Sequence, residues 1–296
     1  MGILKIKNLK QNIFAVVAAM IWGFAFSSQS ACIALGMKAF TFTALRSWIA
    51  VIVLAIIALI FVRRKITKEY LKRALFGGVC CGCFLFVAQV LQQFGLEGTD
   101  SGKGGFLTAL YIIMVPILSI FLKKKTSKLI WISAIIAVIG MFLLCVDITQ
   151  SFSVNVYDLI LVACAIVFAG HILCIDHFED VNGIHLSLIQ MAVVAVICSI
   201  LAIIFETLTL ECFKACFWNI MYMGVFSSGV AYTLQVLAQK GSNPTVISML
   251  LCLESVFALL GGAIFLNEVL LPQEYIGCAI MLVAVVLAQL PQKEKK

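Results

Sequence analysis

Ten apolar segments, each long enough to cross a bilayer, divide this chain of 296 residues. A hydrocarbon core about 30 Å thick needs roughly 20 residues of helix. Helix is the expected form, because lipid offers no hydrogen-bond partner to an open backbone. The segments are 12–34, 40–62, 74–96, 102–122, 128–146, 156–178, 184–205, 217–239, 244–266 and 273–290. We therefore expect an all-α polytopic membrane protein with short loops and no extramembrane domain.

The composition excludes other classes of fold. A hydrophobic content of 63% and a mean hydropathy of +1.13 exclude a soluble globular domain. The alternating segments of about ten residues that build a transmembrane β-barrel are absent. The net charge of +7 is interpreted as topology charge that also meets anionic lipid, and nucleic acid is not expected as a partner.

Basic residues predict the orientation of the chain in the membrane. When the two chain ends and the gaps between segments are assigned alternately to two sides, 17 of the 21 basic residues fall on the side of the N-terminus. The other side holds only Lys38, Lys103 and Lys214, and Arg46 lies inside the second segment. The positive-inside rule then places both termini in the cytoplasm of a multi-pass protein of the cell membrane. An even number of spans agrees with two basic termini on one side.

The two halves of the chain resemble each other weakly at an offset of 144 residues. Ile120-Phe-Leu122 matches Ile264-Phe-Leu266, and Lys124 falls opposite Glu268. We expect two repeats of five helices, 1–150 and 151–296, and an odd number of spans per repeat makes them inverted. Breaks at Gly95–Gly105 and Gln239–Met249 follow the third span of each half. They are either interrupted segments that mark a substrate site or simple helix hairpins.

Two ionisable residues lie well inside predicted spans. A charge at the bilayer centre costs about 2.5–3.5 kcal/mol on insertion scales, so such residues are functional candidates by default. Glu254, in the ninth span, could bind a cationic group or carry a proton, or it could be a protonated structural carboxyl. His171, in the sixth span, could bind substrate or titrate, or it could make an interhelical hydrogen bond. We assign both to substrate binding or proton coupling.

Other polar residues are candidates for a cavity or for a charge pair. Arg46 could extend toward the surface, pair with a carboxylate or steer an anion. Amide side chains share one face of the third span and of the eighth, which predicts either a polar cavity or interhelical hydrogen bonds. Asn12, Gln29 and Thr108 are weaker candidates. The residues that we assign to the cavity lining are Trp22, Gln89, Gln92, Gln93, Tyr111, Tyr232 and Gln235.

The twelve cysteines do not predict a metal site. Cys80, Cys81 and Cys83 are clustered, but on a helix they point in different directions, and a metal needs converging ligands. Cys212 and Cys216 have helical spacing and could form a disulfide, but we interpret them as free thiols. No P-loop is present, so direct use of ATP is not expected, and no metal or cofactor is assigned.

The chain resembles the EamA branch of the drug/metabolite transporter superfamily. The segments that carry the resemblance are Ala19-Met-Ile-Trp-Gly-Phe-Ala-Phe26, Phe42-Thr-Ala-Leu-Arg46, Gly104-Gly-Phe-Leu-Thr-Ala-Leu-Tyr111, Leu253-Glu-Ser-Val-Phe257 and Phe265-Leu-Asn-Glu268. This resemblance implies ten helices in two inverted repeats around a central cavity. It also implies transport of small metabolites, often the export of amino acids. Ser255 stands where the family often has proline, and Lys124 where it usually has an acidic residue.

The expected function is a secondary transporter, and specifically an exporter, of small polar metabolites such as amino acids, working by alternating access. The alternatives are a channel or small-ligand receptor and, with less support, a membrane-embedded enzyme. No converging catalytic set is visible, so no enzyme activity is assigned. The expected partners are a small-molecule substrate, membrane lipid and a second copy in a homodimer. The sequence does not identify the substrate or the coupling ion.

Overall fold

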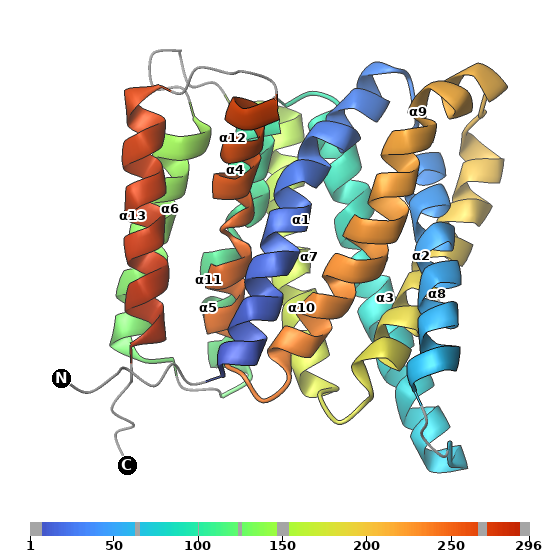
Figure 1. The fold of residues 1–296 in the computed structure, drawn as a ribbon, viewed down its shortest axis with the longest axis horizontal. Coiled ribbons are helices and arrows are strands. Elements are labelled where there is room, and N and C mark those ends of the chain that lie inside the picture. The colour runs from blue at the N-terminus through green and yellow to red at the C-terminus, as the bar shows by residue number, and fades with distance from the viewer. Residues whose placement is uncertain are drawn as a thin grey trace.

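The computed structural model describes residues 8–62, 66–99, 101–123, 126–146, 154–265 and 271–290, and every regular element in these ranges is helical. Within these ranges, ten helical segments are long and apolar enough to span a membrane, as predicted. The helices are α1 (Leu9–Ala34), α2 (Ala39–Phe61), α3 (Lys68–Leu96), α4 (Ser101–Ala109), α5 (Tyr111–Phe121), α6 (Lys128–Cys145), α7 (Val156–His177), α8 (Gly183–Phe205), α9 (Leu210–Tyr222), η1 (Met223–Ala231), α10 (Tyr232–Gln239), α11 (Pro244–Leu251), α12 (Glu254–Phe265) and α13 (Pro272–Gln289) (Figure 1).

Two spans begin about two turns earlier than hydropathy predicts. The third begins at Lys68 rather than 74, and the eighth begins at Leu210 rather than 217. Each start is fixed by a threonine cap, because the side chains of Thr67 and Thr209 accept hydrogen bonds from backbone N–H groups in the first turn. The added turns carry charged residues, so they lower the mean hydropathy while the backbone remains helical.

The first and last helices have their chain-terminal ends on one side of the bundle. Asn12 Nδ2, near the start of α1, donates to Gln289 Oε1, the last residue of α13, at 2.9 Å. We call this side the terminal face and the opposite side the distal face (Figure 1). The described basic residues on the terminal face are Lys10, Lys68, Lys72, Arg73, Lys123, Lys128 and Lys240, and those on the distal face are Lys38, Lys103 and Lys214.

Some of the charged residues on which the predicted orientation and repeat depend lie outside the described residues. This holds for Glu268 and for ten basic residues, which are Lys5, Lys7, Arg63, Arg64, Lys65, Lys124, Lys125, Lys293, Lys295 and Lys296.

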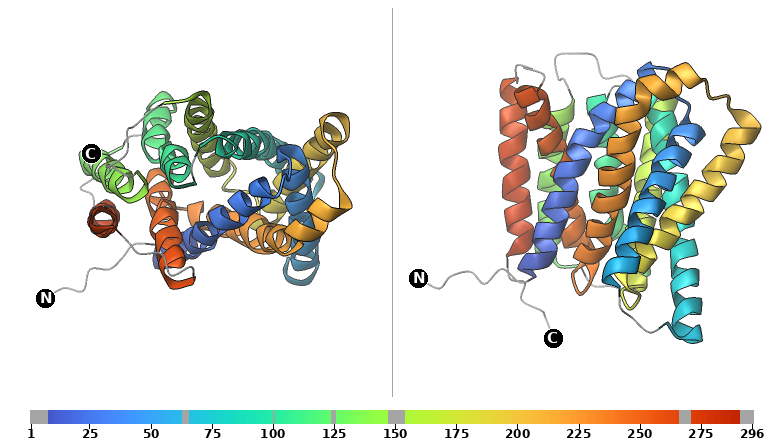
Figure 2. Two further views of the ribbon diagram at one scale, coloured as in Figure 1. Left: turned by 90° about the horizontal axis from the view of Figure 1, so that it is seen from above. Right: turned by 45° about the vertical axis from the view of Figure 1, so that its right-hand side comes forward.

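The helices form two inverted repeats of five spans. Corresponding helices of the two halves pack on each other, α2 against α8 and α6 against α13. The cross-contacts also come in matched pairs. Helix α3 of the first half packs on α7 and α8 of the second half. In the same way, η1 of the second half packs on α1 and α2 of the first half, and α10 also packs on α1. Figure 2 shows α6 and α13 as a pair at one end of the bundle, beside the remaining helices.

The glycine-rich breaks are hairpin turns, and the helix interruptions lie elsewhere. The turn after Leu96 connects α3 to α4, and residues 240–243 connect α10 to α11, so each break surrounds a turn between two spans. The fourth span of each half is interrupted instead, at Leu110 and at Cys252–Leu253. Both interruptions contain tighter turns, because Leu110 N bonds to Leu107 O at 3.3 Å and Leu253 N bonds to Leu250 O at 3.2 Å. The break before Glu254 therefore forms without a neighbouring proline.

Candidate substrate cavity

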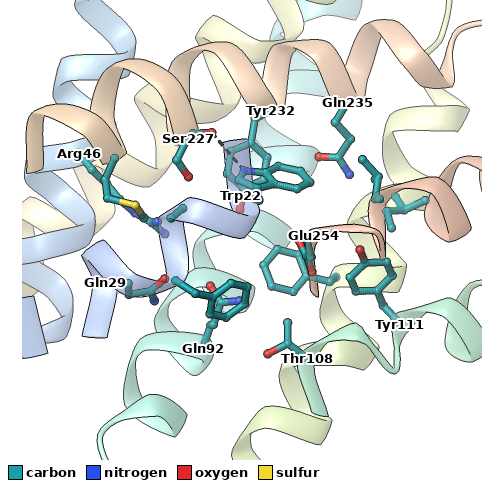
Figure 3. A pocket seen from close by; sticks show the side chains of 16 residues that line it. Trp22, Gln29, Arg46, Gln92, Thr108, Tyr111, Ser227, Tyr232, Gln235 and Glu254 are labelled. Atoms are coloured by element: carbon teal, nitrogen blue, oxygen red, sulfur yellow. Dashed lines mark hydrogen bonds between the residues drawn. The ribbon is translucent and has the colours of Figure 1, made fainter. Parts of the chain in front are cut away.

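A cavity lies between the two halves, beside both interrupted helices. The volume open to the centres of water molecules is about 50 Å³, which is room for several waters. Figure 3 shows polar side chains from α1, α2, α3, α12 and the eighth span around it. The lining residues are Trp22, Ala25, Phe26, Gln29, Arg46, Gln92, Thr108, Tyr111, Phe168, Ile172, Met223, Ser227, Tyr232, Gln235, Leu251 and Glu254.

Glu254 reaches the cavity because it is the first residue of α12, directly after the interruption. The residue is 6% exposed, and none of the hydrogen bonds between described residues involves its carboxyl group. A glycine lets α1 lie close at this level. A Cβ added at Gly23 would lie 2.7 Å from the backbone oxygen of Glu254 and 2.7 Å from Phe257 Cβ. The result is a carboxyl group inside the membrane that faces a cavity and has no cationic partner among the described residues.

Arg46 is the cation of the cavity. It is 2% exposed, so the side chain does not extend to the surface. Its Nε and Nη2 have no hydrogen-bond partner among the described residues, and its guanidinium carbon lies 5.4 Å from the ring centre of Phe42. No ion pair joins it to a described carboxylate. Buried guanidinium N–H groups without partners are costly in an apolar medium, and a bound anion would satisfy them.

Aromatic residues and a π-helix form another part of the wall. Trp22 and Tyr232 pack edge to face with ring centres 4.8 Å apart, and Trp22 Nε1 donates to the backbone oxygen of Ser227 at 3.3 Å (Figure 3). Ser227 lies in η1, and wide turns of this kind occur often at functional sites. Tyr111 and Phe168 also pack edge to face, with ring centres 6.4 Å apart.

The predicted amide stripes divide between cavity and interior. Gln92 and Gln235 line the cavity, whereas Gln89 and Gln93 do not. Gln93 Oε1 instead accepts from Gln29 Nε2 at 2.6 Å, which makes Gln93 a support for a lining residue. The amide of Gln89 is buried and has no described partner. Of the weaker candidates, Gln29 and Thr108 line this cavity, and Asn12 bonds to Gln289 near the terminal face.

His171 lies behind the cavity wall. It is fully buried and is not a lining residue, although Phe168 and Ile172 of the same helix are. Its Nε2 lies 3.0 Å from Gln190 Oε1, and its ring centre is 6.3 Å from that of Tyr232. Its Nδ1 has no described partner. His171 therefore makes the interhelical hydrogen bond and also keeps one free nitrogen close to a cavity residue.

The structure adds lining residues that the sequence did not indicate. Phe168, Ile172, Met223 and Leu251 look like ordinary apolar residues of a membrane span. One signal was present for the eighth span, because Ser227, Ser228 and Gly229 interrupt its apolar sequence inside η1. Small and hydroxyl-bearing residues of this kind favour local changes of helix geometry.

A ten-helix bundle of inverted repeats, with a polar cavity beside interrupted helices, has the architecture of a membrane transporter. The model of the EamA-like transporter family matches residues 9–146 and matches again over residues 155–290. The chain therefore belongs to the EamA-like transporter family.

Two further comparisons cover nearly the whole chain. The chain is 25% identical over 286 residues to an uncharacterized transporter of Archaeoglobus fulgidus, covering 96% of this chain and 87% of that protein. A protein of known crystal structure is 16% identical, with a TM-score of 0.78 over 96% of this chain and 99% of the other. At this identity the likeness concerns the fold alone.

Proposed function

We propose that this chain is a secondary transporter that exports a small polar metabolite by alternating access. The family supports transport, and the inverted repeats provide two related halves that can exchange roles. The charge asymmetry supports a cytoplasmic terminal face in the cell membrane. A homodimer in the membrane remains part of the proposal.

The observation that carries the proposal is the pair of opposite charges in one cavity. Arg46 has N–H groups without described partners, and Glu254 has a carboxyl group without a described cation. A zwitterion such as an amino acid matches both, with its carboxylate toward Arg46 and its amine toward Glu254. The rings of Trp22, Tyr111 and Tyr232 offer an apolar surface between these charges.

Proton coupling is the proposed energy source. Glu254 lies where substrate and proton would compete for the same carboxyl group, so release of one could favour binding of the other. His171 is the second proton carrier in the proposal, because its ring lies near Tyr232 and bonds to Gln190. Direct ATP use is not part of the mechanism, in keeping with the absence of a P-loop from the sequence.

The test is counterflow of amino acids in proteoliposomes over a range of pH. Glu254→Gln should abolish the pH dependence and lower the rate at least about tenfold, since a single charge-assisted contact is worth roughly 1.5–3 kcal/mol. Arg46→Met should weaken binding of carboxylate-bearing substrates by a similar factor. The matched control is Glu211→Gln, an exposed residue of α9, which should behave as wild type. Wild-type rates and pH dependence in Glu254→Gln would refute its coupling role.

A further inference from the structure

The two halves are joined at opposite faces by the same hydrogen bond. On the terminal face, Asn8 Nδ2 donates to the backbone oxygen of Gly241 at 3.1 Å. On the distal face, Asn155 Nδ2 donates to the backbone oxygen of Gly98, also at 3.1 Å. Asn8 and Asn155 are the N-cap residues of α1 and α7, the first helices of the two halves. Each asparagine therefore reaches the turn between the third and fourth spans of the other half.

The residues close to Asn155 have counterparts close to Asn8. On the distal face, Thr99 Oγ1 donates to Asp158 Oδ1 at 2.9 Å, and Asp158 lies three residues after Asn155. We call Gly98, Thr99, Lys103, Asn155 and Asp158 the distal latch. The described hydrogen bonds of this latch join the α3–α4 region to the start of α7.

The terminal face has the matching set. Asn8 Nδ2 also contacts Ser242 Oγ at 3.2 Å, and Gln11 Nε2, three residues after Asn8, contacts the backbone oxygen of Lys240 at 3.5 Å. We call Asn8, Gln11, Lys240, Gly241 and Ser242 the terminal latch. The turn is also held within its own half, because Gly241 N donates to Glu179 Oε2 at 3.2 Å.

The two latches differ in charge. Lys103 Nζ lies 2.6 Å from Asp158 Oδ2, with side chains 18% and 3% exposed. At the terminal latch, the hydrogen bonds described between the two halves come from the uncharged side chains of Asn8 and Gln11. Charge-assisted bonds with little solvent are stronger than neutral ones, so the described contacts of the distal latch are stronger than those of the terminal latch. The Arg73–Asp180 pair also joins the halves on the terminal face, but its side chains are 39% and 57% exposed, so water screens it.

We infer, on the basis of the transport function proposed above, that the two latches are alternate gates. Opening of either face separates the halves at that face and breaks its latch, while the other latch remains closed. The ion pair of Lys103 and Asp158 makes the distal gate the harder one to open. Weakening one latch must then shift the population of conformations in the direction opposite to weakening the other.

The test uses two identical substitutions at related positions. Asn8→Asp and Asn155→Asp are isosteric and remove the amide donor. The carboxylate introduced by Asn155→Asp retains a capping oxygen for α7, and aspartate tolerates the φ of +65° at position 8. The reporter is Ala25→Cys, on the cavity wall, labelled from the distal side of oriented vesicles by a membrane-impermeant maleimide and quantified by mass spectrometry of its peptide.

Asn155→Asp should raise the labelling rate about fivefold, and Asn8→Asp should lower it by a similar factor, as loss of one hydrogen bond predicts. Lys103→Gln, which leaves the cap of α7 intact, should act in the same direction as Asn155→Asp. Equal labelling in all variants, or shifts of the same sign, would overturn the assignment of the latches as gates. Labelling does not depend on the substrate. Opposite shifts without counterflow would therefore count against the transport proposal alone, and counterflow without such shifts would count against the latches alone.

Discussion

At the scale of single residues, Glu206 shows how one side chain can join two spanning helices. It follows the last residue of α8, and its carboxylate accepts hydrogen bonds from Phe40 N at 2.9 Å, Thr41 N at 2.7 Å and Thr41 Oγ1 at 2.7 Å. The first N–H groups of a helix lack partners within the helix and carry partial positive charge. Glu206 therefore caps α2 from the neighbouring half.

Glu206→Ala should destabilise the protein by about 1–2 kcal/mol, because the N–H groups of Phe40 and Thr41 lose a charged acceptor. Thermal unfolding in detergent measures the change. Glu211→Ala, an exposed glutamate of the first turn of α9, is the control and should stay within about 0.5 kcal/mol of wild type. Equal melting temperatures for the two variants would show that the cap contributes nothing.

Surface charges contribute less at this scale. A hydrogen bond from the Arg73 guanidinium lowers the pKa of Asp180 below its ordinary value. The stabilisation from this pair is therefore present at neutral pH and is lost as the pH falls through the pKa of Asp180 in the folded protein. Both side chains are exposed, so the effect is small.

At the scale of elements, α6 and α13 approach closely through two glycines. A Cβ on Gly277 would lie 2.6 Å from the backbone oxygen of Gly140, and one on Gly140 would lie 2.9 Å from Met281 N. Small residues let backbones of membrane helices come into contact, where dispersion forces act over the whole interface. This contact joins the last helix of one repeat to the last helix of the other.

Gly277→Ala should destabilise the protein by about 1–3 kcal/mol, since the added methyl group meets backbone atoms that do not give way. Gly105→Ala is the matched control. Gly105 lies in α4 and has no atom within 4 Å of an added Cβ, so alanine should raise stability by up to about 1 kcal/mol through helix propensity. Thermal unfolding of both variants checks the signs, and destabilisation by Gly105→Ala alone would contradict the packing argument.

At the scale of the whole molecule, the ten spans and the contact between Asn12 and Gln289 put the start of α1 and the end of α13 on the same face. Protease-sensitive tags fused to the two ends of the chain should therefore be cleaved from the same side of the membrane. With the orientation proposed here, both tags should be cut in inside-out vesicles and protected in right-side-out ones. Tags cut from opposite sides would be incompatible with ten spans.

The sequence predicted the spans, the repeat and an ionisable Glu254 inside a span for a physical reason, and it left the burial of Arg46 open. Depth in a bilayer depends on the local run of apolar residues, and the cost of a buried charge depends on its own position along that run. Glu254 could therefore be selected from a single segment as a buried carboxyl, and Arg46 as a possible charge partner. The positions of the basic residues record topology in the same local way.

Tertiary structure decided everything that depends on a partner from another segment. The helix interruptions at Leu110 and Cys252–Leu253 carry no glycine or proline, and the same local sequence would suit a continuous helix. Gln92 lines the cavity while Gln93 supports Gln29, although both are equally polar. The latches pair residues more than 50 positions apart. Such contacts arise when helices from distant parts of the sequence pack together. The periodicity within one segment does not predict them.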